Sequence, residues 1–378
     1  MEEHGLTPAA LETQLKNFRE GFPFLPVTRA ASCGDGIRVL DAAGIEQAAA
    51  RYDRAKESLR VVKFVPASGA ATRMFKDLFE FVREGRRTAV VGELLANRRR
   101  FAFWPELRTI IGDDADELRT VENIVAEGLR YGETQKGLVS FHRYGDEVRK
   151  AVEEHLVEGA QYAAAGGEVK IHFTVSPEHL TRFEALLAEK IPGYESRFGV
   201  KYRISFSVQD PSTDTLAVNP DCTPFRRADG RLLFRPAGHG ALIGNLGKID
   251  ADIVFVKNID NVTTDARRGD TVLYKKALAG VLLALQERIF EYLMALEVPG
   301  AELEPIAAFI ENELCVKLPK DYGTALLRQV LDRPIRVCAA WCATRASRAA
   351  APSGRSTTTA PNRSKSPSRA RSHLPTSR

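Results

Sequence analysis

Short apolar runs alternate with amphipathic helical stretches through the middle of this 378-residue chain. We predict strands at 60–66, 169–175, 202–209 and 252–256, and most of them lead through a loop into a helical segment. This alternation indicates a mainly parallel sheet that helices cover on both faces. Since parallel sheets bind ligands beyond the carboxyl ends of their strands, the loops that follow these runs are the candidate sites.

The remaining segments give the predicted domain organisation. Residues 1–58 form a helical N-terminal region, and 59–338 form an α/β core. Within the core, 86–165 is mostly helical and charged, and 216–234 is a hairpin that turns at Asp-Gly. We find no internal repeat.

The composition changes abruptly at Ala339. Residues 339–378 are nearly all Ala, Arg, Ser, Pro and Thr, have no apolar period and cannot bury a core. One interpretation is a disordered basic tail. The other is a frameshift in a GC-rich gene, because codons exist for Ala339–Gly354 whose displaced frame encodes a sequence typical of globular proteins. The second interpretation predicts a truncated core and a natural protein that continues further.

Charge and composition exclude several classes of protein. The chain carries +5, but its last forty residues hold seven Arg, one Lys and no acid, so the rest carries −3 and nucleic-acid binding is not expected. No run of eighteen apolar residues indicates a membrane span, and the N-terminus does not resemble a signal peptide. Five cysteines without a CxxC pair favour a cytoplasmic protein. The oligomeric state stays open.

The first strand-end loop, 67–73, consists of small residues followed by Thr72 and Arg73. Small side chains let the backbone approach a phosphate, successive N–H groups can form an anion-binding nest, and the next helix start adds a favourable dipole. Thr72 offers a hydroxyl and Arg73 a charge-assisted hydrogen bond. The loop is neither a Walker loop nor a GxGxxG fingerprint. A tight turn without a ligand is the alternative interpretation.

Other candidate groups lie at or near later strand ends. The Gly-His-Gly loop 238–240 suits contact with a flat base or ribose, or it is a plain turn. Asp260 can hold Mg²⁺ together with substrate phosphates, or it belongs to an Asx-turn. Gln209 can read a base edge. Lys136 can place an ammonium on a phosphate, or it lies in solvent.

Taken together, these segments resemble the nucleotide-sugar pyrophosphorylases that use UTP. The resemblance lies in Ser68–Met74, Phe206–Gln209, Pro236–Gly240 and Val256–Asn261, which follow the same order along the chain. The chain is more similar to a bacterial family known as domain of unknown function 4301, which is grouped with the nucleotide-diphospho-sugar transferase fold. That resemblance covers about residues 1–338. It implies a three-layer, Rossmann-like fold of the GT-A type with a helical N-terminal region and helical insertions.

The resemblance also implies roles for single residues. Arg73 and Lys136 would be catalytic, and Asp260 would bind Mg²⁺. The residues implied to bind the nucleotide and substrate are Ser68, Gly69, Ala70, Thr72, Gln209, Gly238, His239 and Gly240.

The implied function is a nucleotidyltransferase that joins an NTP and a sugar 1-phosphate with Mg²⁺, so the expected partners are small molecules. Ser68 and Ala71 stand where the usual enzyme loop has glycines, and an added Cβ at Ala71 can crowd a phosphate. Two alternatives therefore stay open: a degenerate member that binds a nucleotide-sugar without turnover, and an inactive truncated product.

Overall fold

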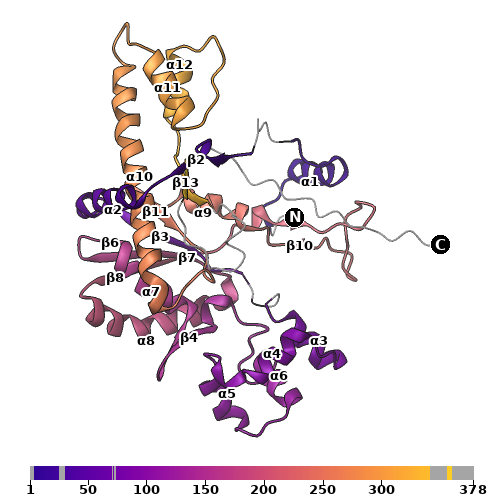
Figure 1. Cartoon of the computed structure of the whole chain (residues 1–378). Coiled ribbons are helices and arrows are strands. Elements are labelled where there is room, and N and C mark those ends of the chain that lie inside the picture. The colour runs from indigo at the N-terminus through magenta and orange to yellow at the C-terminus, as the bar shows by residue number, and fades with distance from the viewer. Residues whose placement is uncertain (1–3, 25–29, 70, 72–73, 341–355, 360–378) are drawn as a thin grey trace, which may run out of the picture. The chain divides into compact units, whose positions relative to one another are not determined.

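The structure is a computed structural model, and it describes residues 4–24, 30–69, 71, 74–340 and 356–359. Helices and strands alternate along the chain in a mixed α/β arrangement (Figure 1). Within the described ranges, no helix has both the length and the apolar character that crossing a membrane requires. The predicted residues Ala70, Thr72 and Arg73 lie outside the described residues, as does most of 339–378.

The chain divides into two compact units. The first comprises 1–23 and 54–272, and the second comprises 24–53 and 273–378. The three-part division made from the sequence stays a prediction. All the described candidate site residues fall in the first unit.

The first unit contains a sheet in the order β11–β3–β7–β8, and these strands run parallel. The short β6 (Ala164–Ala165) pairs antiparallel with the start of β7, so the sheet as a whole is mixed. Parallel pairing places the carboxyl ends of the other strands at one edge. The predicted strands are confirmed as β3 (Val61–Pro66), β7 (Glu168–Thr174), β8 (Lys201–Ser207) and β11 (Ile253–Val256).

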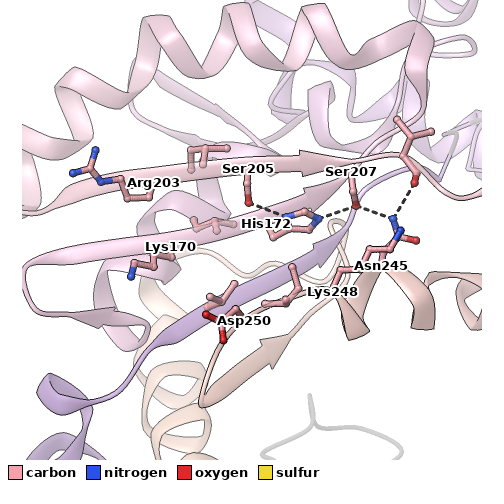
Figure 2. Close-up of a pocket in the computed structure, with 13 residues that line it drawn as sticks. Lys170, His172, Arg203, Ser205, Ser207, Asn245, Lys248 and Asp250 are labelled. Atoms are coloured by element: carbon pink, nitrogen blue, oxygen red, sulfur yellow. Dashed lines mark hydrogen bonds between the residues drawn. The ribbon is translucent and has the colours of Figure 1, made fainter.

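The two faces of this sheet differ, because successive side chains of a strand point to opposite sides. In β7, Ile171 and Phe173 belong to the hydrophobic core, whereas His172 lies on the other face. Figure 2 shows His172 there beside Ser205 and Ser207 of β8. Ser205 is exposed, so the expected cover of both faces is incomplete along β8.

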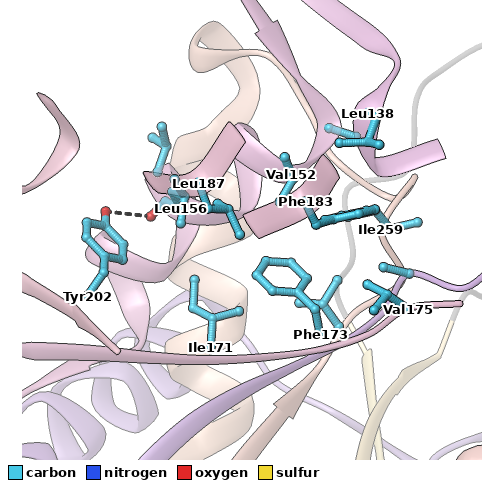
Figure 3. Packing of buried hydrophobic residues seen from close by; sticks show 14 of the residues in the cluster. Leu138, Val152, Leu156, Ile171, Phe173, Val175, Phe183, Leu187, Tyr202 and Ile259 are labelled. Atoms are coloured by element: carbon cyan, nitrogen blue, oxygen red, sulfur yellow. Dashed lines mark hydrogen bonds between the residues drawn. The ribbon is translucent and has the colours of Figure 1, made fainter. Parts of the chain in front are cut away.

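The core of the first unit lies between the sheet and helices α7 (Ala151–Tyr162) and α8 (Leu180–Phe198). Phe173 and Phe183 are fully buried and face each other across this layer (Figure 3). Burial of each such side chain contributes about 1.5–3 kcal/mol. The Tyr202 hydroxyl donates a hydrogen bond of 2.9 Å to the Leu156 carbonyl, so β8 and α7 are also joined by a polar contact.

A group of helices between β3 and β4 packs around a second core. Thr88 and Asp116 cap two of them, accepting hydrogen bonds from the backbone N–H groups of Val91 and Arg119. The chain then forms an antiparallel hairpin, β4–β5, inside the range 86–165 that was predicted to be mostly helical. The elements are α3 (Lys76–Glu84), α4 (Ala89–Ala96), α5 (Trp104–Ile111), α6 (Glu117–Val125), β4 (Ser140–Tyr144) and β5 (Glu147–Lys150).

A small antiparallel pair and the first helix complete this unit. Helix α1 (Pro8–Glu20) begins with Thr7 as the N-cap and Pro8 at its first position. Leu6 packs with Leu216 and Phe234 of the strand pair. The strands are β9 (Thr215–Leu216) and β10 (Phe234–Arg235), and they confirm the predicted hairpin.

The second unit is mainly helical, and its core joins α10, α11 and α12. Gly280 of α10 is required for packing, because a Cβ built there would lie 1.8 Å from the Ala48 carbonyl oxygen of α2. Helices α2 and α10 both cross the division between the units. The elements of this unit are β1 (Ser32–Cys33), β2 (Gly36–Val39), α2 (Ala42–Ala55), α10 (Asp265–Ala295), α11 (Glu304–Asn312), α12 (Thr324–Leu331), β12 (Val337–Ala340) and β13 (Ser356–Thr359).

Candidate functional site

Three loops meet at the carboxyl edge of the parallel sheet. The loop after β3 is joined to segment 134–138 by two backbone hydrogen bonds, Ala71 N to Thr134 O at 3.3 Å and Lys136 N to Gly69 O at 3.5 Å. The loop after β11 is joined to the end of β3, where the Ile259 N–H donates to the Pro66 carbonyl at 3.1 Å. Segments far apart in sequence therefore form one surface at this edge.

An ion pair connects two of these loops. The Lys136 ammonium lies 2.6 Å from Oδ2 of Asp260, and the two side chains are 26% and 33% exposed. Both candidates are thus brought together, and both keep access to solvent. A half-exposed pair of this kind contributes little to stability, so its charges can be redirected to a ligand at small cost.

Gln135 directly precedes Lys136 in the chain and was missed as a candidate. Its side chain is 1% exposed, and its amide nitrogen donates to Ser176 Oγ at the start of the turn after β7. Its Oε1 is buried and has no hydrogen-bond partner among the described residues. Buried amide oxygens are normally satisfied, so this atom is an acceptor available to a water or ligand.

The glycines of the candidate loops face open space. A Cβ added at Gly69, Gly238 or Gly240 would meet nothing within 4 Å. By contrast, a Cβ at Gly137 would lie 2.5 Å from the Phe183 ring. Packing therefore requires glycine at 137, whereas nothing within the described protein requires it at the three loop positions.

Other predicted residues are not joined to this cluster by any contact among the described residues. The Gln209 amide donates to Thr213 Oγ1 of its own loop at 3.2 Å. Gly238 precedes η7 (His239–Leu242), and His239 and Gly240 are exposed. This segment leads into helix α9 (Ile243–Gly247), whose Asn245 donates hydrogen bonds to Ser207 and Val208 at the end of β8. Ser68 is half-buried within the loop after β3.

The donor set at this edge limits how a metal can bind. Asp260 is the carboxylate among the candidate residues, and one of its oxygens already contacts Lys136. The described residues contain no group of three or more His, Cys, Asp or Glu side chains arranged to hold a metal. The site therefore fits a Mg²⁺ ion that phosphates and waters mainly coordinate, and does not fit an all-protein cage.

Buried charges support the loop that carries Asp260. Glu158 of α7 is fully buried and pairs with Lys63 of β3 at 3.1 Å and with Lys257 at 2.6 Å. Burial alone would raise the pKa of Glu158, but the two ammonium groups outweigh it and lower that pKa. His155 Nε2 lies 3.1 Å from the Ile259 carbonyl. Burial, aided by the charge of Lys63, lowers the pKa of His155 well below its usual value, so this histidine is neutral.

A second buried network holds the chain just after that loop. The Glu154 carboxylate of α7 accepts hydrogen bonds from the Tyr144 hydroxyl at 2.7 Å and from Arg268 of α10, and it lies 3.0 Å from His142 Nδ1. Burial, with the hydrogen bond to Glu154, raises the pKa of Tyr144 to about 12. These residues gave no signal in the sequence, because charged residues in a helical stretch are normally solvated.

Comparison with known proteins supports the family assignment and no more. A family model described as "Domain of unknown function (DUF4301)" matches residues 1–341. No curated protein and no solved structure matches the chain. The relation to pyrophosphorylases therefore stays a prediction. Since the model covers most of the sequence, the chain belongs to the DUF4301 family.

Proposed function

We propose that the carboxyl edge of the sheet binds a nucleoside triphosphate and a sugar 1-phosphate, and that the protein is a nucleotidyltransferase. The observation that carries the proposal is the Lys136–Asp260 pair, placed where the loops after β3 and β11 meet. An amine and a carboxylate beside an open glycine loop suit a phosphate and its counter-ion. We also propose that the α/β fold is of the nucleotide-diphospho-sugar transferase type.

The proposed reaction needs positioning and charge neutralisation, and no covalent nucleophile from the protein. A phosphate oxygen of the sugar 1-phosphate forms a bond to the α-phosphorus of the triphosphate. The bond from that phosphorus to the bridging oxygen breaks, and pyrophosphate leaves. Lys136 would turn from Asp260 to the phosphates and neutralise their charge. A bound Mg²⁺ would add further neutralisation, held by Asp260 and the substrate phosphates.

The test is pyrophosphate exchange into UTP in the presence of Mg²⁺ and a panel of sugar 1-phosphates. We expect the wild-type chain to exchange label with at least one sugar phosphate. Lys136→Met should lower the exchange rate at least about a hundredfold, because it removes the positive charge that faces the phosphates. Asp260→Asn should have a comparable effect and should weaken the dependence on Mg²⁺.

Lys201→Met is the matched control. Lys201 also forms a close ion pair, to Glu195 at 2.7 Å, but it lies at the opposite edge of the sheet, where β8 begins. It should leave exchange unchanged. Thermal stabilisation by UTP without exchange would favour the binding protein over the enzyme. No exchange and no stabilisation with any nucleoside triphosphate would refute both.

A further inference from the structure

A groove lies on the sheet face opposite α7 and α8, on the side of His172, Ser205 and Ser207. It has a volume of about 510 Å³, and residues of β7, β8, α9 and the turn after α9 line most of it. That volume is in the range of pockets for small metabolites. Of the predicted site residues that the structure describes, none lines this groove.

The floor of the groove is a row of hydrogen-bonded side chains (Figure 2). His172 is 7% exposed, with Nδ1 2.8 Å from Ser205 Oγ and Nε2 2.8 Å from Ser207 Oγ. The Asn245 amide nitrogen donates to Ser207 Oγ at 2.8 Å and to the Val208 carbonyl at 2.9 Å. The His172 ring also stacks on the ring of Phe64 in the neighbouring strand β3, and this contact helps to fix the orientation of the imidazole.

The donors in this row set its direction. The Asn245 amide nitrogen can only donate, so Ser207 Oγ accepts from it. If Ser207 donates its proton to Nε2 of His172, Nδ1 carries the ring proton. Nδ1 then donates to Ser205 Oγ, and the Ser205 hydroxyl proton is left over for a ligand. With this tautomer the row ends in a donor at Ser205, which is exposed and lines the groove.

Positive charge surrounds this donor. Lys170, Arg203 and Lys248 line the groove, whereas Asp250 is the acidic residue among the lining side chains. Asp250 is already paired with Arg60. Arg203 is 67% exposed and contacts Glu168, which is not a lining residue. The groove therefore favours an anion, and the fixed fork of Arg203 suits a phosphate.

Apolar side chains complete the lining and indicate the rest of the ligand. Val62 and Ile249 provide aliphatic surface beside the polar row. We propose that this groove is a second ligand site, which binds a small organic monophosphate through Ser205, Arg203 and Lys248. This inference is independent of the proposed nucleotidyl transfer.

Phenyl phosphate is a suitable probe, since it combines one phosphate with one apolar ring, and phenol is its uncharged counterpart. Calorimetric titration of the full chain should give saturable binding of phenyl phosphate and none of phenol. Lys248→Met and Arg203→Met should each weaken binding about tenfold, and Ser205→Ala should weaken it several-fold. Arg182→Met is the control, because Arg182 is an exposed arginine of α8 on the covered side of the sheet.

The carboxyl edge can be separated from the groove with the same probe. Lys136→Met should leave phenyl phosphate binding unchanged, and Lys248→Met should leave UTP binding unchanged. The proposal is overturned if millimolar phenyl phosphate does not bind, or if Lys136→Met abolishes binding while the groove variants retain it. All these substitutions are at exposed or half-buried positions, so thermal melts should match the wild type and confirm that each variant is folded.

Discussion

Two glycines of the candidate site differ in whether packing of the protein requires them. Gly69 and Gly137 lie in segments that contact each other at the same edge of the sheet, and only Gly69 was a predicted binding residue. A Cβ at Gly137 would meet Phe183 at 2.5 Å and Ile259 at 3.2 Å, whereas a Cβ at Gly69 would meet open space. Sequence alone cannot tell these two situations apart.

We therefore predict opposite outcomes for two alanine substitutions. Gly137→Ala should lower the free energy of unfolding by about 1–3 kcal/mol, because the new methyl group overpacks the core. Gly69→Ala should change it by less than about 0.5 kcal/mol but weaken UTP binding, because its Cβ would enter the space proposed for phosphates. Urea denaturation and UTP titration of both variants measure these effects. Equal UTP affinity in Gly69→Ala and wild type would argue against phosphates at this loop.

Elements were predictable where a periodic apolar pattern exists. The runs that became β3, β7, β8 and β11 were found from their apolar residues. The β4–β5 hairpin lies within 86–165, a range predicted as mostly helical, although the sequence of 133–144 interrupts the helical pattern. Burial of Arg149 and Glu154, at 1% and 0% exposure, depends on partners from distant elements that no local pattern reveals.

The buried carboxylate of Glu154 joins α7 to β4 and to the first turns of α10. We predict that Glu154→Gln lowers the free energy of unfolding by about 3–5 kcal/mol, because Arg268 would lose its buried counter-charge. Glu147→Gln is the control: Glu147 contacts Arg149 but is 44% exposed, and its loss should cost less than about 1 kcal/mol. Denaturant unfolding of both variants gives the comparison, and similar losses would show that Glu154 has no special structural role.

For the molecule as a whole, the sequence predicted the mixed α/β class and the family, and it placed Gly69, Lys136 and Asp260 on loops that do meet. It did not reveal the groove over His172. Serines at alternate positions of β8 are what any solvent-facing strand shows, and His172 is hydrogen-bonded to two of them. A groove depends on which segments cover a face, and that arrangement is set by tertiary packing.

The stability of the molecule should fall as the solution is acidified below about pH 6.5. Burial lowers the pKa values of His155 and His172 in the folded protein, so the unfolded chain binds more protons below the usual histidine value of 6.5. Each histidine can thus remove up to about 1.4 kcal/mol per pH unit. The lowered pKa of Glu158 adds a further loss below its usual value of 4.5.

His155→Gln isolates one of these contributions, because a glutamine amide can keep the hydrogen bond to the Ile259 carbonyl but does not titrate. We expect the variant to be less stable than wild type at pH 7.5, since His155 is fully buried, but to lose less stability between pH 7 and pH 5. His239→Gln, at an exposed position, should follow the wild-type curve. The measurement is the free energy of unfolding at several pH values. The curves of this free energy against pH for wild type and His155→Gln should converge as the pH falls. Parallel curves would mean that His155 takes up its proton without unfolding.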